Sequence, residues 1–122
     1  MTINDYLEYI DYFNSRQYDR YYTDDIVVQL PTTQLRGRQN VKDFYLKMGE
    51  FIHETVRVRK AFIDGDTIGA NIWSDFYCVQ DTSDYLERTM TKGEMFRAEL
   101  FVLYTMEGPK FSHIRAARFR AP

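Results

Sequence analysis

The first hydrophobic pattern along the chain is helical. Apolar residues recur every three or four positions over the range 3–13, which predicts an amphipathic helix that ends near Asn14. Thr2 is a suitable N-cap for this helix, and Asp5 stands three residues later, in the position of a capping box. The chain is therefore expected to open with a capped helix that has one apolar face.

Between the first helix and residue 52 the pattern predicts two helices and one strand. The range 18–22 is a candidate short helix, and the apolar run 26–30 predicts a buried strand that Pro31 ends. After Gly37, apolar residues return to helical spacing over the range 41–52, which predicts a further amphipathic helix.

After residue 52 the period changes from helical to two, which is typical of strands. Strands are predicted at 56–62, 67–79, 94–105 and 110–120. Asp64-Gly65-Asp66 and the turn at 107–109 predict two tight hairpins, and the range 80–92 reads as a polar loop. Helices followed by a meander of long strands are typical of the α+β class, with the helices packed on one face of a curved sheet.

Composition limits the possible functions. The 122 residues predict one domain spanning 1–122. Sixteen Lys and Arg against eighteen Asp and Glu give a net charge of -2, which argues against nucleic acid or an anionic membrane surface as the main partner. Aromatic residues make up 16% of the chain, with ten Tyr and nine Phe, and this excess is the main compositional anomaly.

The cysteine and histidine counts are low. One Cys excludes an intrachain disulfide, and two His with one Cys are too few soft ligands for a zinc site. We therefore expect no metal and no cofactor. No apolar run approaches transmembrane length, and the first residues lack the pattern of a signal peptide, so a cytoplasmic location is expected.

Several segments resemble one protein family. The segment FNSRQYDRYYTDD at 13–25 is similar to the opening of the nuclear-transport-factor-2-like superfamily, especially its SnoaL-like, polyketide cyclase-like branch. The segment LRGR at 35–38 with the apolar positions after it, and the turns around 64–66 and 106–111, match this branch too. The similarity covers nearly the whole chain, and it specifies the fold more than the activity.

The resemblance implies a cone in which three helices close over a strongly bent sheet and leave an apolar pocket. Members usually pair into dimers through the outer face of the sheet, so we expect a homodimer. The branch includes cyclases, ketosteroid isomerase-like enzymes, dehydratases and epoxide hydrolases. The expected partner is a small hydrophobic molecule that bears oxygen.

Two known arrangements of the superfamily fit this chain poorly. A ketosteroid isomerase needs a helix hydroxyl and a strand carboxylate; Tyr9 falls at the first position, but Leu30 falls at the second and cannot accept a proton. The epoxide-hydrolase arrangement needs two carboxylates and an arginine. Asp75 falls near one carboxylate, but Trp73 and Ala116 replace the other two groups.

A looser constellation remains on two neighbouring strands. Trp73 and Asp75 share one face of a strand, and Arg97 and Glu99 share one face of the next. A mid-strand Asp is costly to bury unless it is paired, and Arg97 is a candidate partner. Two interpretations stay open: a structural ion pair on the dimer face, which we favour, and a catalytic acid–base pair.

Histidine and tyrosine side chains complete the candidate site. Histidine is the residue type that can exchange a proton near neutral pH without help, and alternation predicts that His113 on the last strand shares a face with Phe111. Tyrosine hydroxyls can orient an oxygenated ligand in an apolar pocket. The candidate catalytic residues are Asp75, His113, Tyr9 and Arg97, and the candidate ligand-binding residues are Tyr22, Tyr45, Trp73 and Glu99.

The leading hypothesis is cofactor-free acid–base chemistry, such as cyclisation, isomerisation or dehydration. Asp75 or His113 would move the proton, while Tyr9, Tyr22 or Arg97 would stabilise the oxyanion. The alternative is a non-catalytic module that binds a ligand or dimerises. The two hypotheses differ in where the side chains on the paired strands point: into a closed cavity or onto the outer face.

Overall fold

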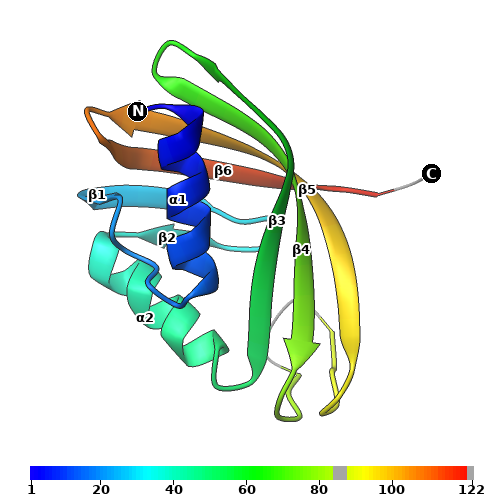
Figure 1. Ribbon diagram of the computed structural model, residues 1–122. Coiled ribbons are helices and arrows are strands. Elements are labelled where there is room, and N and C mark those ends of the chain that lie inside the picture. Colours follow the sequence, from blue (N-terminus) through cyan, green and yellow to red (C-terminus); the bar gives the residue numbers. More distant parts are fainter. Residues whose placement is uncertain (84–87, 121–122) are drawn as a thin grey trace.

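The computed structural model describes residues 1–83 and 88–120, which form two helices on one face of a six-stranded sheet (Figure 1). The helices are α1 (Ile3–Asn14) and α2 (Arg38–Met48). The strands are β1 (Tyr22–Gln29), β2 (Gln34–Arg36), β3 (Ile52–Asp64), β4 (Thr67–Cys78), β5 (Met95–Glu107) and β6 (Lys110–Phe119). The predicted α+β class is confirmed.

Helix α1 begins and packs as its sequence predicts. The Thr2 hydroxyl accepts from the Asp5 backbone N–H at 3.2 Å, and the Asp5 carboxylate accepts from the Thr2 N–H at 2.8 Å. This reciprocal pair satisfies two donors that the first turn would otherwise leave unpaired. The buried side chains of the helix lie three or four residues apart and face the sheet; they are Tyr6, Tyr9, Ile10 and Phe13.

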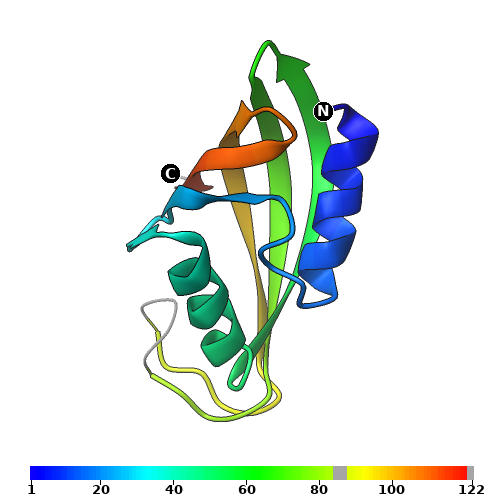
Figure 2. The same ribbon diagram turned by 90° about the vertical axis from the view of Figure 1, so that its left-hand side faces the viewer.

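The sheet is mixed and strongly curved. Its strand order is β2-β1-β6-β5-β4-β3, with β1 and β6 parallel and all other neighbours antiparallel. The predicted hairpin turns are confirmed, and Gly65 and Gly108 take positive φ values of 60° and 63° that suit glycine. In Figure 2 the strands β1 and β6 run across β3–β5, so the open sheet curls around the space beneath the helices.

Three expectations about the elements are wrong. Residues 18–21 form a turn instead of a helix, and Tyr22 already begins β1 because it pairs with Phe111 of β6. Helix α2 ends at Met48 and does not reach residue 52, because Ile52 already begins β3, where it pairs with Cys78 of β4. The third helix that the resemblance implied is absent from the described ranges 1–83 and 88–120.

One short strand and one loop also differ from the predicted elements or extend beyond the described residues. The three-residue strand β2 was not predicted, because it is too short to show a period. The predicted polar loop 80–92 includes residues 84–87, which lie outside the described residues.

The two faces of the sheet carry different side chains. On β4, Ile72, Ser74 and Phe76 are buried beneath the helices, whereas Trp73 and Asp75 alternate with them and point outward. The core fills the inner side and is largely aromatic. Its largest fully buried side chains are Tyr6, Tyr22, Phe111, Ile26, Ile52 and Ile68.

Candidate functional site

A cavity lies between the two helices and the inner face of the sheet. It consists of two chambers with volumes of about 120 Å³ and about 60 Å³. Both chambers are lined by Leu30, Tyr45, Glu54 and Leu100, so they adjoin one another. The smaller, inner chamber lies under α1 among tyrosines, while the larger, outer chamber reaches the mouth formed by the 31–33 loop and the end of β6.

Glu54 is the one carboxylate that lines both chambers in the part of the chain that the structure describes. It lies on the inner face of β3, opposite Phe76 of β4. The Ser74 hydroxyl donates to Glu54 Oε2 at 2.7 Å. Within residues 1–83 and 88–120, no Lys, Arg or His forms an ion pair with Glu54, and Oε1 has no hydrogen-bond partner.

The protonation of Glu54 is set mainly by burial. Burial raises the pKa of Glu54 to about 7, and the Ser74 hydrogen bond opposes this rise only in part. Some of the side-chain surface remains accessible, and because Glu54 lines both chambers we place this surface on the cavity wall. A carboxyl with such a pKa exchanges its proton readily near neutral pH, which is the property that a general acid or base needs.

Tyrosines line the inner chamber, and three of them, Tyr9, Tyr22 and Tyr104, have hydroxyls in hydrogen-bonded pairs. The hydroxyls of Tyr9 and Tyr22 lie 2.7 Å apart, and the Tyr6 hydroxyl donates to the Tyr104 hydroxyl at 3.0 Å. Burial raises the pKa of Tyr9, Tyr22 and Tyr104 well above the ordinary range. These phenols therefore stay neutral and act as hydrogen-bond donors and acceptors.

Tyr45 of α2 is the hydroxyl best placed to act together with Glu54. Its ring stacks on Tyr18 at a centroid distance of 5.2 Å, and it lines both chambers. Burial raises the pKa of Tyr45 well above its ordinary value, and the nearby charge of Glu54 raises it further. Among the described residues the Tyr45 hydroxyl has no hydrogen-bond partner, so its proton is free for a ligand oxygen.

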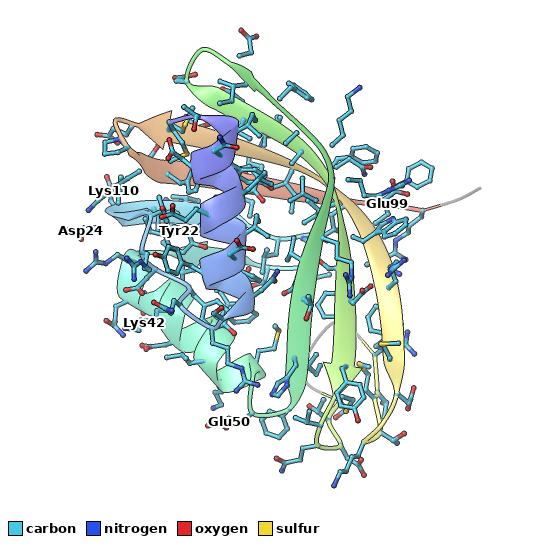
Figure 3. All side chains as sticks on the ribbon, in the orientation of Figure 1. Tyr22, Asp24, Lys42, Glu50, Glu99 and Lys110 are labelled. Atoms are coloured by element: carbon cyan, nitrogen blue, oxygen red, sulfur yellow. The ribbon has the colours of Figure 1, made fainter. Side chains whose placement is uncertain are left out.

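The structure places the sequence-predicted residues on two opposite faces. Tyr9, Tyr22 and Tyr45 lie on the cavity wall. The predicted group on β4 and β5, which includes Asp75 and Glu99, lies on the outer face of the sheet. Figure 3 shows Glu99 pointing away from the helices, whereas Tyr22 lies beside α1.

Asp75 and Arg97 form the ion pair that their spacing allowed. Asp75 Oδ1 accepts from Arg97 Nε at 2.6 Å, and Asp75 Oδ2 accepts from Arg97 Nη2 and Arg57 Nε, each at 3.0 Å. The hydrogen bonds from Arg97, with those from Arg57, lower the pKa of Asp75. A carboxylate held by two arginines on the outer face is a poor proton carrier, so this placement favours the structural interpretation over the catalytic one.

Trp73 and Glu99 extend the same outer network. The guanidinium groups of Arg59 and Arg97 lie 4.3 Å and 4.0 Å from the centre of the Trp73 ring, a geometry that favours cation–π attraction. Glu99 accepts from Arg59 Nη1 at 3.3 Å and from Asn71 Nδ2 at 2.9 Å. Neither Trp73 nor Glu99 lines the cavity, so their ligand-binding role stays a prediction that this cavity does not support.

His113 also lies away from the cavity, on the outer side of β6 beside Gln29 (Nε2 to Oε1, 3.1 Å). The expectation that Phe111 shares its face is wrong. A register shift between Thr105 and Met106 makes Met106 pair with Phe111 and Thr105 pair with His113. This bulge turns Phe111 into the core and His113 outward.

Sequence reasoning missed Glu54, the residue on which the cavity chemistry depends. A signal was present, because Ile52, Glu54 and Val56 alternate with polar residues and so share the apolar face of a strand. This strand signal was missed because the apolar positions as far as Ile52 also fit a helical period. Among residues 1–83 and 88–120, no three His, Cys, Asp or Glu gather to hold a metal ion, and no helix is long and apolar enough to span a membrane.

Comparisons with known proteins show a shared fold. No family model and no curated protein sequence matches the chain. Among solved structures, it is similar to a SnoaL-like polyketide cyclase from Agrobacterium tumefaciens, with 17% identity, a TM-score of 0.77 and coverage of 98% of this chain and 93% of the other.

Two further structures agree with this result. One is a nuclear-transport-factor-2-like protein of unknown function from Burkholderia pseudomallei, with 11% identity, a TM-score of 0.77 and coverage of 98% and 92%. The other, from Catenulispora acidiphila, has a ketosteroid isomerase-like fold and is in complex with trimethylamine, with 11% identity, a TM-score of 0.75 and coverage of 96% and 86%. The chain thus has the nuclear-transport-factor-2-like fold that its segments resembled.

Proposed function

We propose that the cavity binds a small, largely apolar molecule with a carbonyl oxygen, and that Glu54 moves a proton on this molecule without a cofactor. The single observation that carries the proposal is a cavity-lining carboxyl with a pKa of about 7 and no cationic partner among the described residues. Such a group lowers stability when it is ionised, because an unpaired charge is poorly solvated in an apolar wall. A purely structural wall would be more stable with an apolar residue there.

The chemistry follows from the two groups at the junction of the chambers. Glu54 Oε1 would take a proton from the carbon next to the carbonyl, and the C–H electron pair would move onto the carbonyl oxygen as an enolate. The Tyr45 hydroxyl would donate to that oxygen, where negative charge develops. Return of the proton to another carbon would give an isomer, and attack of the enolate on a second carbonyl would close a ring.

The size of the cavity limits the substrate. The outer chamber, at about 120 Å³, is close to the roughly 150 Å³ of an engineered cavity that holds one benzene molecule. The rings of Phe44, Phe76 and Phe96 line this chamber and suit an apolar ring. These dimensions support a substrate with a single ring, or a chain of similar bulk.

The test is deuterium exchange at carbon. Acetophenone in D₂O would be incubated with the protein at pH 8, and loss of its methyl protons would be followed by NMR. We expect exchange above the buffer rate with the wild type, exchange at the buffer rate with Glu54→Gln, and wild-type exchange with the matched control Glu99→Gln. Binding without exchange in the wild type would instead favour a non-catalytic ligand-binding module, and equal exchange in Glu54→Gln would rule out the role of Glu54.

We also propose that two copies pair through the outer face of the sheet. Large apolar side chains are exposed on that side, among them Phe62, Phe101, Leu103 and Phe119. Some of them surround an open hollow of about 580 Å³. The neighbouring network carries both signs of charge, from Arg57 and Arg97 to Asp75 and Glu99, which suits a face that meets its own copy.

A further inference from the structure

We propose that the molecule bound in the cavity carries a carboxylate, and that Arg118 at the mouth holds this carboxylate. The inference deepens the proposed function and rests on it for the position of the reacting carbonyl, beside Glu54 and Tyr45. The carboxylate would be at the opposite end of the same ligand, and the proton-transfer chemistry does not itself require it.

The inner face of the sheet places an arginine and an acid at the two ends of an aromatic floor. Arg118 lies opposite Leu100, and its guanidinium is 5.9 Å from the centre of the Phe96 ring. Phe96 stacks on Phe76 at a centroid distance of 5.0 Å. Phe76 in turn pairs with Glu54 across β3 and β4. A ligand ring lying along this floor would have a cation at one end and the carboxyl at the other.

Apart from its contact with the Phe96 ring, the charge of Arg118 has no acidic partner in the described part of the chain. Neither an ion pair nor a hydrogen bond joins Arg118 to an acidic side chain among residues 1–83 and 88–120. Arg88 gives the contrast: it covers the same Phe96 ring at 4.3 Å, but its guanidinium is paired with Glu94 at 3.7 Å. Arg120 lines the same outer chamber as Arg118, so the mouth carries two positive charges.

Arg118 is also not the counter-ion of Glu54. The groups that set the pKa of Glu54 are the surrounding protein and Ser74, with no contribution from an arginine. Three strand spacings of about 4.8 Å separate β3 from β6. Arg118 lies opposite Leu100, four residues along β5 from Phe96, and Phe96 is on the row of Glu54, so the two backbone positions are about 20 Å apart along the sheet. The two side chains reach inward from these strands, so the gap between their charged ends suits one ring with a substituent at each end.

A carboxylate fits this mouth better than another polar group does. A guanidinium forms two parallel hydrogen bonds with a carboxylate, and these charge-assisted bonds are stronger than bonds to a neutral oxygen. The ligand class is therefore a single-ring or similarly sized keto acid, with the ketone buried at Glu54 and the acid at the rim.

The experiment compares three probes that differ only at one end. Binding of 4-acetylbenzoate, methyl 4-acetylbenzoate and acetophenone would be measured by titration calorimetry on the wild type, Arg118→Gln and Arg115→Gln. Arg115 is exposed on the other side of the same strand and lines the outer-face hollow, so its variant has the same net charge as Arg118→Gln. We expect 4-acetylbenzoate to bind the wild type about ten-fold more tightly than the two neutral probes.

The two arginine variants test whether Arg118 binds the ligand carboxylate. Arg118→Gln should abolish this preference, and Arg115→Gln should keep it. The inference is overturned if the ester binds as tightly as the acid, if both variants lose the preference equally, or if 4-acetylbenzoate does not bind. Deuterium exchange in the same samples separates the two proposals. A carboxylate preference without exchange would refute only the proton-transfer chemistry, whereas exchange that depends on Glu54 without a preference would refute only the role of Arg118.

Discussion

Replacing Glu54 by Gln should stabilise the protein, and by an amount that depends on pH. Gln keeps the shape of the side chain and an oxygen that accepts from Ser74, but it carries no charge. In the wild type, burial raises the pKa of Glu54 from 4.5 to about 7. The variant thus removes the cost of holding an ionised carboxylate in the cavity wall.

The magnitude follows from the linkage between pKa and folding. The unfolded chain loses the Glu54 proton near pH 4.5 and the folded protein near pH 7, so the folded state holds more protons in this window. The free energy of unfolding contributed by Glu54 is therefore greatest below pH 4.5, falls as the pH rises to 7, and stays low above it. The difference between pKa values of 4.5 and about 7 corresponds to about 3 kcal/mol.

The assay is urea unfolding of the wild type and Glu54→Gln at intervals from pH 4.5 to pH 8.5. We expect nearly equal stability at pH 4.5 and a gain of about 3 kcal/mol for the variant above pH 7.5. Ser74→Ala removes a hydrogen bond that lowers the pKa of Glu54, so in that variant the fall in stability should extend to higher pH. A difference between wild type and Glu54→Gln that stays constant with pH would show that ionised Glu54 does not destabilise the folded protein, as would a less stable Glu54→Gln at pH 8.

Three further changes separate the cavity from the outer face. Tyr45→Phe should slow the exchange of acetophenone protons at least ten-fold, because the enolate loses a donor, and it should leave urea unfolding unchanged; unaltered exchange would contradict the role of Tyr45. Asp75→Asn should lower the free energy of unfolding at pH 7 by about 1 kcal/mol with exchange intact, whereas lost exchange with intact folding would return Asp75 to the site. Phe101→Glu should convert the expected dimer to a monomer in light scattering, and a monomeric wild type would refute the proposed pairing.

Local signals made part of the fold predictable. Helix α1 could be predicted because its cap, Thr2 with Asp5, and its apolar period are encoded within a few residues. The two hairpins were equally local, since glycines mark their turns. The strand identity of Tyr22 was not local, because it depends on pairing with Phe111, which is far along the chain.

The candidate site was harder to predict than the fold. Alternation shows that Asp75 and its neighbour Ser74 lie on opposite faces of a strand, but only the packing of the helices decides which face encloses the cavity. Glu54 stood at the overlap of a helical and a strand pattern, where the period alone is ambiguous. The bulge between Thr105 and Met106 changes which side chains of β6 point inward, and the alternation of residues in the sequence does not show where it lies.

Glu54 is proposed as the base that moves a proton in the cavity, and the pH dependence of exchange is the sharpest test of this role. The rate of deuterium incorporation into acetophenone would be measured from pH 5 to pH 9 for the wild type and Glu54→Gln. We expect a wild-type rate, corrected for buffer, that rises with pH to a plateau with its midpoint near 7, where Glu54 loses its proton. We expect no such rise for Glu54→Gln. The same pH profile in both proteins, or no exchange above buffer in the wild type, would contradict this role.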